Sequence, residues 1–97
     1  MDAKARKALS IIRKCVAAER DRLLDHFHQR LAMRGLLWSD VLTVLDKPAD
    51  VRYGKLDRFD RPKWILAGKA LDGLGIEIVC ALDHDERGNV TVFITIY

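Results

Sequence analysis

The spacing of the apolar residues changes near residue 50 of this 97-residue chain, and that change limits the folds it can adopt. Before residue 50, apolar side chains recur at steps of three and four, as at Leu9, Ile12 and Val16, which is typical of an amphipathic helix. After it they alternate with polar side chains, which is typical of strands. Helices followed by strands, in a chain with room for a single domain over residues 1–97, predict an α+β fold.

The first half of the chain predicts a long helix. Residues 3–33 contain no proline or glycine, and Gly35 then ends the helical pattern. A continuous helix over this stretch would be about 46 Å long, too long for a compact domain with a radius of gyration of about 13 Å. The helix therefore either breaks within residues 17–22, which lack a large apolar side chain, or projects from the domain. We favour a projecting helical extension over residues 1–23, which forms a homodimer through the apolar stripe named above.

A short second helix and an antiparallel meander complete the predicted fold. Ser39 is the expected N-cap of a helix over residues 40–47, which Pro48 ends. The strands are expected over residues 51–54, 64–71, 76–82 and 90–97. In the last of these, alternation puts Val90, Val92, Ile94 and Ile96 on one face and Thr91, Phe93, Thr95 and Tyr97 on the other. We therefore expect two helices packed on an antiparallel sheet of three or four strands.

Composition and spacing exclude several kinds of protein. Cys15 and Cys80 lie among apolar neighbours and are too few for a disulfide framework, so we expect them in the core of a cytoplasmic protein. No signal peptide is visible, and no apolar run approaches the roughly 20 residues that span a bilayer. The chain has no glycine-rich phosphate loop and no zinc spacing, and residues 83–86 fit an exposed acidic turn better than a metal site. We therefore expect no cofactor, no metal and no membrane partner.

The net charge of +3 is distributed unevenly along the chain. Residues 1–34 hold nine Lys or Arg against four acids, and residues 52–69 hold six against two, giving +5 and +4. Residues 35–51 and 70–97 are acidic, at −2 and −4. If the two basic segments meet in space they form one face for a polyanion; if they do not, they are ordinary surface charge.

The first basic segment places cationic side chains at steps of four, at Arg22, His26, Arg30 and Arg34. Each step drifts by about 40° on a helix, so the four would form one stripe beside the buried face. Imidazole exchanges a proton near neutral pH, and guanidinium groups bind phosphate oxygens in pairs. The stripe therefore suits cleavage of an RNA phosphodiester, with His26 as general acid or base. The alternative is a solvated helix face without a chemical role.

The second basic segment interleaves cations with aromatic residues. Tyr53, Phe59 and Trp64 lie among its Lys and Arg residues, as in surfaces that bind phosphates and stack bases. We expect an RNA-binding set in which cations join a hydroxyl of the last strand: Arg22, Arg58, Arg61, Lys63, Lys69 and Thr95. The alternative is a flexible hairpin loop that its aromatic residues merely anchor.

Several of these residues together resemble a known family. The pattern His26-x3-Arg30-x3-Arg34 with the closing Thr95-Ile-Tyr97 is similar to family 4258 of the domains of unknown function, a group of small bacterial domains, over residues 24–97. The resemblance implies a distant relation to the RelE, ParE and BrnT toxins, which fold as helices on a small antiparallel sheet. Family members commonly begin with a strand just before the histidine, where this chain has a charged helix.

The resemblance implies a toxin-type protein that an antitoxin partner neutralises. In one interpretation it is a metal-independent endoribonuclease acting on RNA or the ribosome, with His26, Arg30, Arg34 and Tyr97 as its catalytic residues. Lys63 is a further candidate to assist, on our own reading of its charge. The alternative hypothesis is a non-catalytic module that binds a protein target or forms a dimer.

Overall fold

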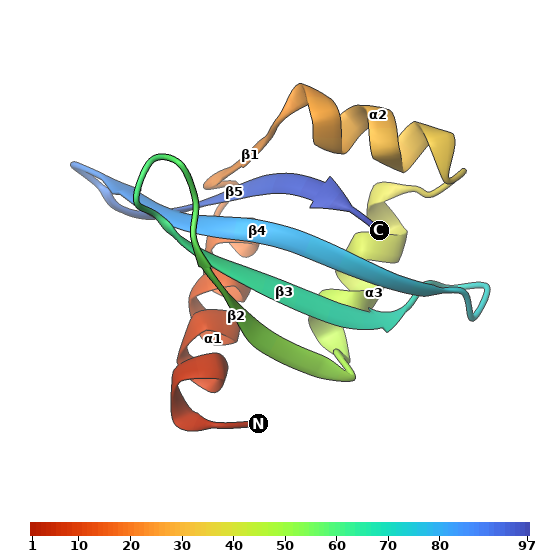
Figure 1. Cartoon of the computed structure of the whole chain (residues 1–97), viewed down its shortest axis with the longest axis horizontal. Coiled ribbons are helices and arrows are strands. Elements are labelled where there is room, and N and C mark those ends of the chain that lie inside the picture. The colour runs from red at the N-terminus through yellow and green to blue at the C-terminus, as the bar shows by residue number, and fades with distance from the viewer.

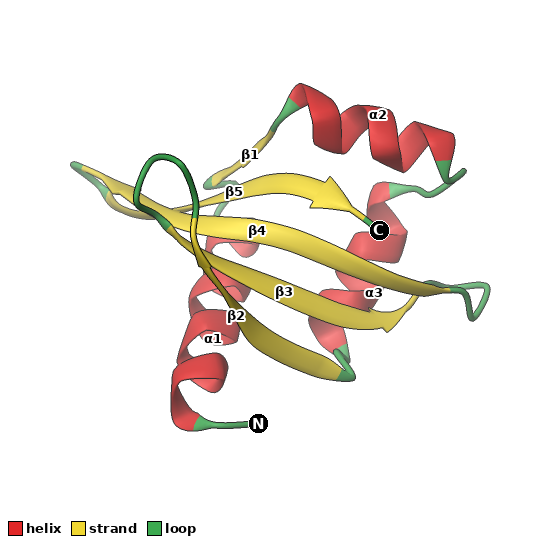
Figure 2. Ribbon diagram, viewed as in Figure 1, coloured by secondary structure: helices red, strands yellow, loops and turns green.

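The computed structural model describes residues 1–97 and contains three helices and five strands (Figures 1 and 2). In chain order they are α1 (Ala3–Ala17), β1 (Asp21–Leu23), α2 (Asp25–Met33), α3 (Trp38–Asp46), β2 (Asp50–Leu56), β3 (Pro62–Lys69), β4 (Gly75–Asp85) and β5 (Gly88–Ile96). The strands form one sheet in the order β1-β5-β4-β3-β2. Only β1 and β5 run parallel, so the sheet is mixed. The predicted α+β class is confirmed, with five strands instead of three or four.

The sheet has a core face, which the helices cover, and an outer face, which they leave open. Figure 2 shows α1 and α3 behind the sheet, with α2 lying along β5. Register places Leu66 and Ile78 on the core face, where both are fully buried. Lys63 and Ala81 pair on the outer face, and the loop over residues 57–61 arches above that face (Figure 1). The outer face therefore carries no helix, although Ala81 itself is fully buried on it.

The helix expected over residues 3–33 is broken, and our preference for a continuous, projecting helix is wrong. The chain turns after α1 with Glu19 at φ 58°, and β1 then pairs with residues 91–93 of β5. The backbone bonds to β5 on both sides of β1, from the Thr91 N–H to the Arg20 carbonyl and from the Leu24 N–H to the Phe93 carbonyl. Residues 17–22 carry no large apolar side chain, so a helix over them would have no apolar face to pack on the sheet. They form a turn and the start of an edge strand instead.

The apolar stripe of α1 packs within its own chain. Leu9 and Ile12 are buried in the core, and Val16 is partly buried against it. The homodimer stays a prediction, but these side chains are already covered. Cys15 and Cys80 are buried as expected, and burial raises the pKa of the Cys80 thiol. None of the helices combines the length and apolarity needed to cross a bilayer.

The connection between α2 and α3 is built around Gly35 and Asp40. Gly35 has φ 63°, and the Leu36 N–H closes the last turn of α2 onto the Leu31 carbonyl, which confirms the predicted helix end. The N-cap of α3 is Leu37, two residues before the predicted Ser39. The Asp40 carboxylate replaces a capping hydroxyl because it accepts the Leu37 N–H at 2.8 Å. It also accepts the N–H of Leu71 at 3.0 Å, which ties α3 to the β3–β4 turn.

A bulge in β5 changes the faces predicted for the last strand. Val79 pairs with Thr95 whereas Cys80 pairs with Phe93, so Ile94 is the extra residue. Phe93 and Ile96 therefore both point into the core, and Thr95 turns to the outer face. The alternation expected for residues 90–97 is wrong beyond Phe93, because a bulge leaves no trace in a pattern of apolar residues.

Close packing of α3 on β3 predicts a site of overpacking at Gly68. A Cβ added there would lie 3.0 Å from Cγ1 of Val44, whereas one added to Gly75 would have no neighbour within 4 Å. We expect Gly68→Val to lower the free energy of unfolding by about 1–3 kcal/mol, and Gly75→Val to leave it nearly unchanged. Urea denaturation of both variants measures this, and equal stabilities would contradict the packing described.

Candidate functional site

Three aromatic side chains fix the position of α2. Phe27 is fully buried, and its ring centre lies 5.4 Å from that of Phe93 and 6.5 Å from that of Trp38. The rings of Trp38 and Phe93 are also 5.4 Å apart, at 86°. This cluster joins α2, α3 and β5. Since β1 reaches only residues 91–93, α2 lies beside the part of β5 that has no strand partner on that side.

Polar side chains of α2 meet the C-terminal end of β5, and we call His26, Arg30, Arg34 and Tyr97 the cationic edge. Nε of Arg30 donates to the Ile96 carbonyl at 2.9 Å, and its Cζ lies 5.6 Å from the centre of the Tyr97 ring. Nη2 of Arg34 is 3.5 Å from the Gly75 carbonyl oxygen. His26 is exposed one turn before Arg30. The structure thus brings Arg30 against Tyr97, and His26 and Arg34 lie one turn before and one turn after Arg30 along the chain.

The arginines of the cationic edge have no carboxylate partner. Every ion pair of the chain that an arginine makes involves Arg20, Arg22, Arg52 or Arg61. Arg30 and Arg34 donate hydrogen bonds only to backbone carbonyl oxygens, and a guanidinium group carries five N–H donors. Most of their donors therefore remain available to an anion. No grouping of His, Cys, Asp or Glu side chains in the chain could hold a metal ion.

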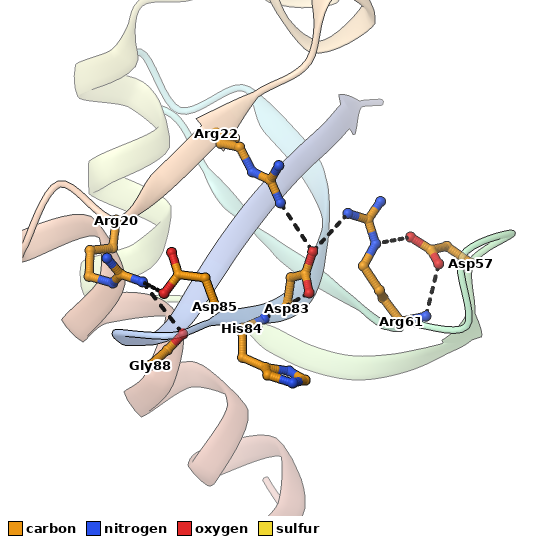
Figure 3. A network of polar contacts seen from close by, with 8 residues as sticks. All are labelled: Arg20, Arg22, Asp57, Arg61, Asp83, His84, Asp85 and Gly88. Carbon is orange, nitrogen blue, oxygen red and sulfur yellow. Dashed lines mark hydrogen bonds and ion pairs between the residues drawn. The ribbon is translucent and has the colours of Figure 1, made fainter.

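Arg22 and Arg61, both predicted to bind RNA, lie instead in an ion-pair network with Asp57 and Asp83 (Figure 3). Asp83 accepts from Arg22 at 3.1 Å and from Arg61 at 3.3 Å, and Arg61 also pairs with Asp57 at 2.8 Å. Arg22 belongs to β1 and not to the stripe on α2, so the predicted stripe loses one member. The two basic segments do meet here, but they meet across a shared carboxylate.

The geometry of this network lowers the pKa of both carboxyl groups. For Asp83, the hydrogen bond from the His84 N–H is the largest cause, and Arg61 and Arg22 add to it. Burial acts to raise the pKa of Asp57, yet the N–H groups of Arg61 and Phe59 and the Arg61 guanidinium together outweigh it. Both carboxylates are therefore held in the charged form, which keeps Arg61 in place.

The remaining predicted residues fall into three places. Arg58 and Lys63 line a hollow of about 350 Å³ on the outer face, with the apolar residues Leu24, Leu56, Phe59 and Ile94. Lys69 lies beside Tyr97 in a second hollow, next to the cationic edge. Thr95 is buried, and its hydroxyl has no hydrogen-bond partner, so it is not exposed to a ligand.

The two carboxylates of the ion-pair network, Asp57 and Asp83, were not among the residues predicted from the sequence. Asp83 was expected in an exposed turn, but β4 runs to Asp85 and half-buries it. The spacing of Asp57 and Arg61 at four residues was the available signal for their contact. Nothing in the sequence placed Asp83 near either arginine, because the contact depends on the sheet register.

Comparison with known proteins assigns a family to most of the chain. A family model described as a domain of unknown function (DUF4258) matches residues 23–97. The matched part begins in β1 and includes the cationic edge and the outer-face hollow. No curated protein and no solved structure matches the chain.

The ion-pair network predicts a pH-dependent contribution to stability. Because Asp57 and Asp83 have lower pKa values folded than unfolded, their contribution is complete above about pH 4 and is lost as the pH falls through the folded values. We expect Arg61→Met to lower the unfolding free energy at pH 7 by about 1–3 kcal/mol and to flatten its fall in acid. Arg52→Met, which removes the exposed ion pairs of Arg52 with Asp50 and Glu77, is the control and should change the stability far less. Chemical denaturation from pH 7 to pH 2 measures both, and parallel curves for the two variants would refute this role.

Proposed function

The chain belongs to the DUF4258 family, and from that premise we propose that it is a toxin-type protein that binds and cleaves RNA without a metal ion. The cationic edge is its active site. The observation that supports the proposal is that Arg30, which contacts Tyr97 one turn after His26, and Arg34 have no carboxylate to neutralise them. A pair of unneutralised guanidinium groups next to an exposed imidazole fits a phosphodiester.

In the proposed reaction, RNA supplies its own nucleophile. The imidazole of His26 accepts the proton of a ribose 2′-hydroxyl, and the 2′-oxygen forms a bond to the adjacent phosphorus. The bond from phosphorus to the 5′-oxygen breaks, and that oxygen takes a proton from the Tyr97 hydroxyl or from water. The products are a 2′,3′-cyclic phosphate and a 5′-hydroxyl end. Arg30 and Arg34 stabilise the charge that develops on the phosphoryl oxygens.

The relation to RelE, ParE and BrnT toxins is part of the proposal. It is supported by two helices, α2 and α3, that precede a four-stranded antiparallel meander, as the resemblance implied. The strand that family members place just before the histidine is β1, so the departure expected from the sequence does not exist. We propose that the protein acts on RNA in the cytoplasm and that an antitoxin partner covers the cationic edge.

Substitution of His26 tests the catalytic part of the proposal. We expect His26→Ala to lower the cleavage rate of single-stranded RNA by roughly 10²–10⁴-fold, as for loss of a general base. Arg30→Ala should lower it by about 10²–10³-fold, as for loss of one oxyanion donor. Growth after induction in bacteria and the appearance of RNA fragments provide the readouts.

Arg13→Ala is the matched control for Arg30→Ala. Arg13 also donates to backbone carbonyl oxygens, those of Leu45 and Asp46, but it lies on α1. It should leave cleavage unchanged. Equal growth and no RNA fragments with the wild type and His26→Ala would sink the enzyme proposal and leave a non-catalytic binding module.

Salt dependence tests phosphate binding separately from cleavage. Each phosphate contact to a single strand contributes about 0.7 to the slope of log affinity against log salt concentration. We therefore expect Arg30→Ala/Arg34→Ala to reduce this slope by about 1.4, whereas Arg13→Ala leaves it unchanged. Filter-binding titrations at several salt concentrations measure the slope. An affinity for RNA that does not change with salt concentration would contradict phosphate binding.

A further inference from the structure

The loop between β2 and β3 holds an aromatic ring out in solvent. Phe59 is 62% exposed, although burial of a phenylalanine side chain is favourable. The loop is nonetheless firmly built, because the Asp57 carboxylate accepts the N–H of Phe59 at 2.8 Å and that of Arg61 at 2.9 Å. The Asp57 N–H also donates to the Arg61 carbonyl at 2.8 Å. The ring is thus exposed from a well-defined backbone.

Two guanidinium groups flank this ring. Cζ of Arg58 lies 5.0 Å and that of Arg61 lies 4.9 Å from the ring centre. Arg61 is committed to Asp57 and Asp83, whereas Arg58 has no carboxylate partner. Aromatic rings beside arginines are the usual platform on which proteins stack unpaired bases.

The ring also forms part of the wall of the outer-face hollow of about 350 Å³. Leu24, Leu56 and Ile94 supply further apolar walls, and Lys63 supplies a second cation without a carboxylate partner. Asp57 and Arg61 complete the lining, and the ion pair between them neutralises the Asp57 charge. A flat apolar body with an attached negative charge matches this lining. That is the composition of a nucleotide.

We propose that this hollow binds one nucleobase of single-stranded RNA, stacked on Phe59, with Arg58 and Lys63 on the adjoining phosphate. The inference rests on the proposed function for the identity of the polymer. The position of the hollow supports the proposal. Ile94 of β5 lines the hollow, and the carbonyl of Ile96, two residues further along the same strand, accepts a hydrogen bond from Arg30. Two residues of a strand span about 7 Å, so the hollow lies close to the cationic edge. Leu24, which also lines the hollow, is the N-cap of the helix that carries His26. One strand of RNA can therefore reach both sites.

A binding titration with two matched probes tests this site. The probes are fluorescent 2′-O-methyl oligonucleotides of about ten residues, a length that one small fold can bind; one carries bases and the other is abasic. The 2′-O-methyl group blocks cleavage, so binding is measured alone. We expect Phe59→Ala to weaken binding of the base-bearing probe by roughly 5- to 100-fold and to leave the abasic probe unaffected.

Two variants serve as controls. Phe59→Trp retains a stacking surface and should keep the wild-type affinity. Tyr53→Ala removes another exposed aromatic residue, which packs on Trp64 at 5.5 Å and does not line the hollow, and it should change neither affinity. Thermal melts check that each variant folds.

The outcomes separate this site from the proposed function. Unchanged affinity of Phe59→Ala, or an equal loss with both probes, overturns the base site even if the wild type cleaves RNA. A base-dependent loss with no cleavage by the wild type supports the base site and removes the nuclease proposal. Failure of the wild type to bind either probe, with Phe59 instead required for a protein partner, overturns both.

Discussion

The contact of Phe27 with Phe93 and Trp38 is the interaction on which the arrangement of this protein depends. It is the point where α2, α3 and β5 meet, and it lies where the sheet changes from a paired strand to an open edge. Without β1 alongside, the end of β5 would present unpaired backbone groups. Arg30 satisfies one of these by donating to the Ile96 carbonyl. The aromatic contact therefore both covers the sheet edge and orients the helix that carries the candidate catalytic residues.

A second constraint acts on the outer face, where one carboxylate joins two distant basic segments. Asp83 bonds to Arg22 of β1 and to Arg61 of the β2–β3 loop, so it neutralises the cations at the point where the segments meet. The positive charge available to a ligand is displaced from this point. It remains at Arg30 and Arg34 in the cationic edge and at Arg58 and Lys63 in the outer-face hollow.

The parts of the fold that depend on local patterns were predictable from the sequence. The α+β class, the helix end at Gly35, the burial of both cysteines and the meander follow from spacing and turn residues. The three-residue strand β1 was not predictable, because its pairing with β5 and not its own apolar content makes it a strand. The bulge at Ile94 and the contacts of Asp83 were equally hidden, since each is set by register between strands.

The difference between local patterns and strand register also explains which site residues could be predicted from the sequence. His26, Arg30 and Arg34 follow a helical spacing, and the helix exists, so they lie together. Arg22 has that spacing but falls in a strand, and Thr95, predicted to bind RNA, lies after the bulge and is buried. The unneutralised cations form two clusters, Arg30 and Arg34 in the cationic edge and Arg58 and Lys63 in the outer-face hollow. A polymer of phosphates can contact both, and this is why we propose an RNA strand and not a mononucleotide as the ligand.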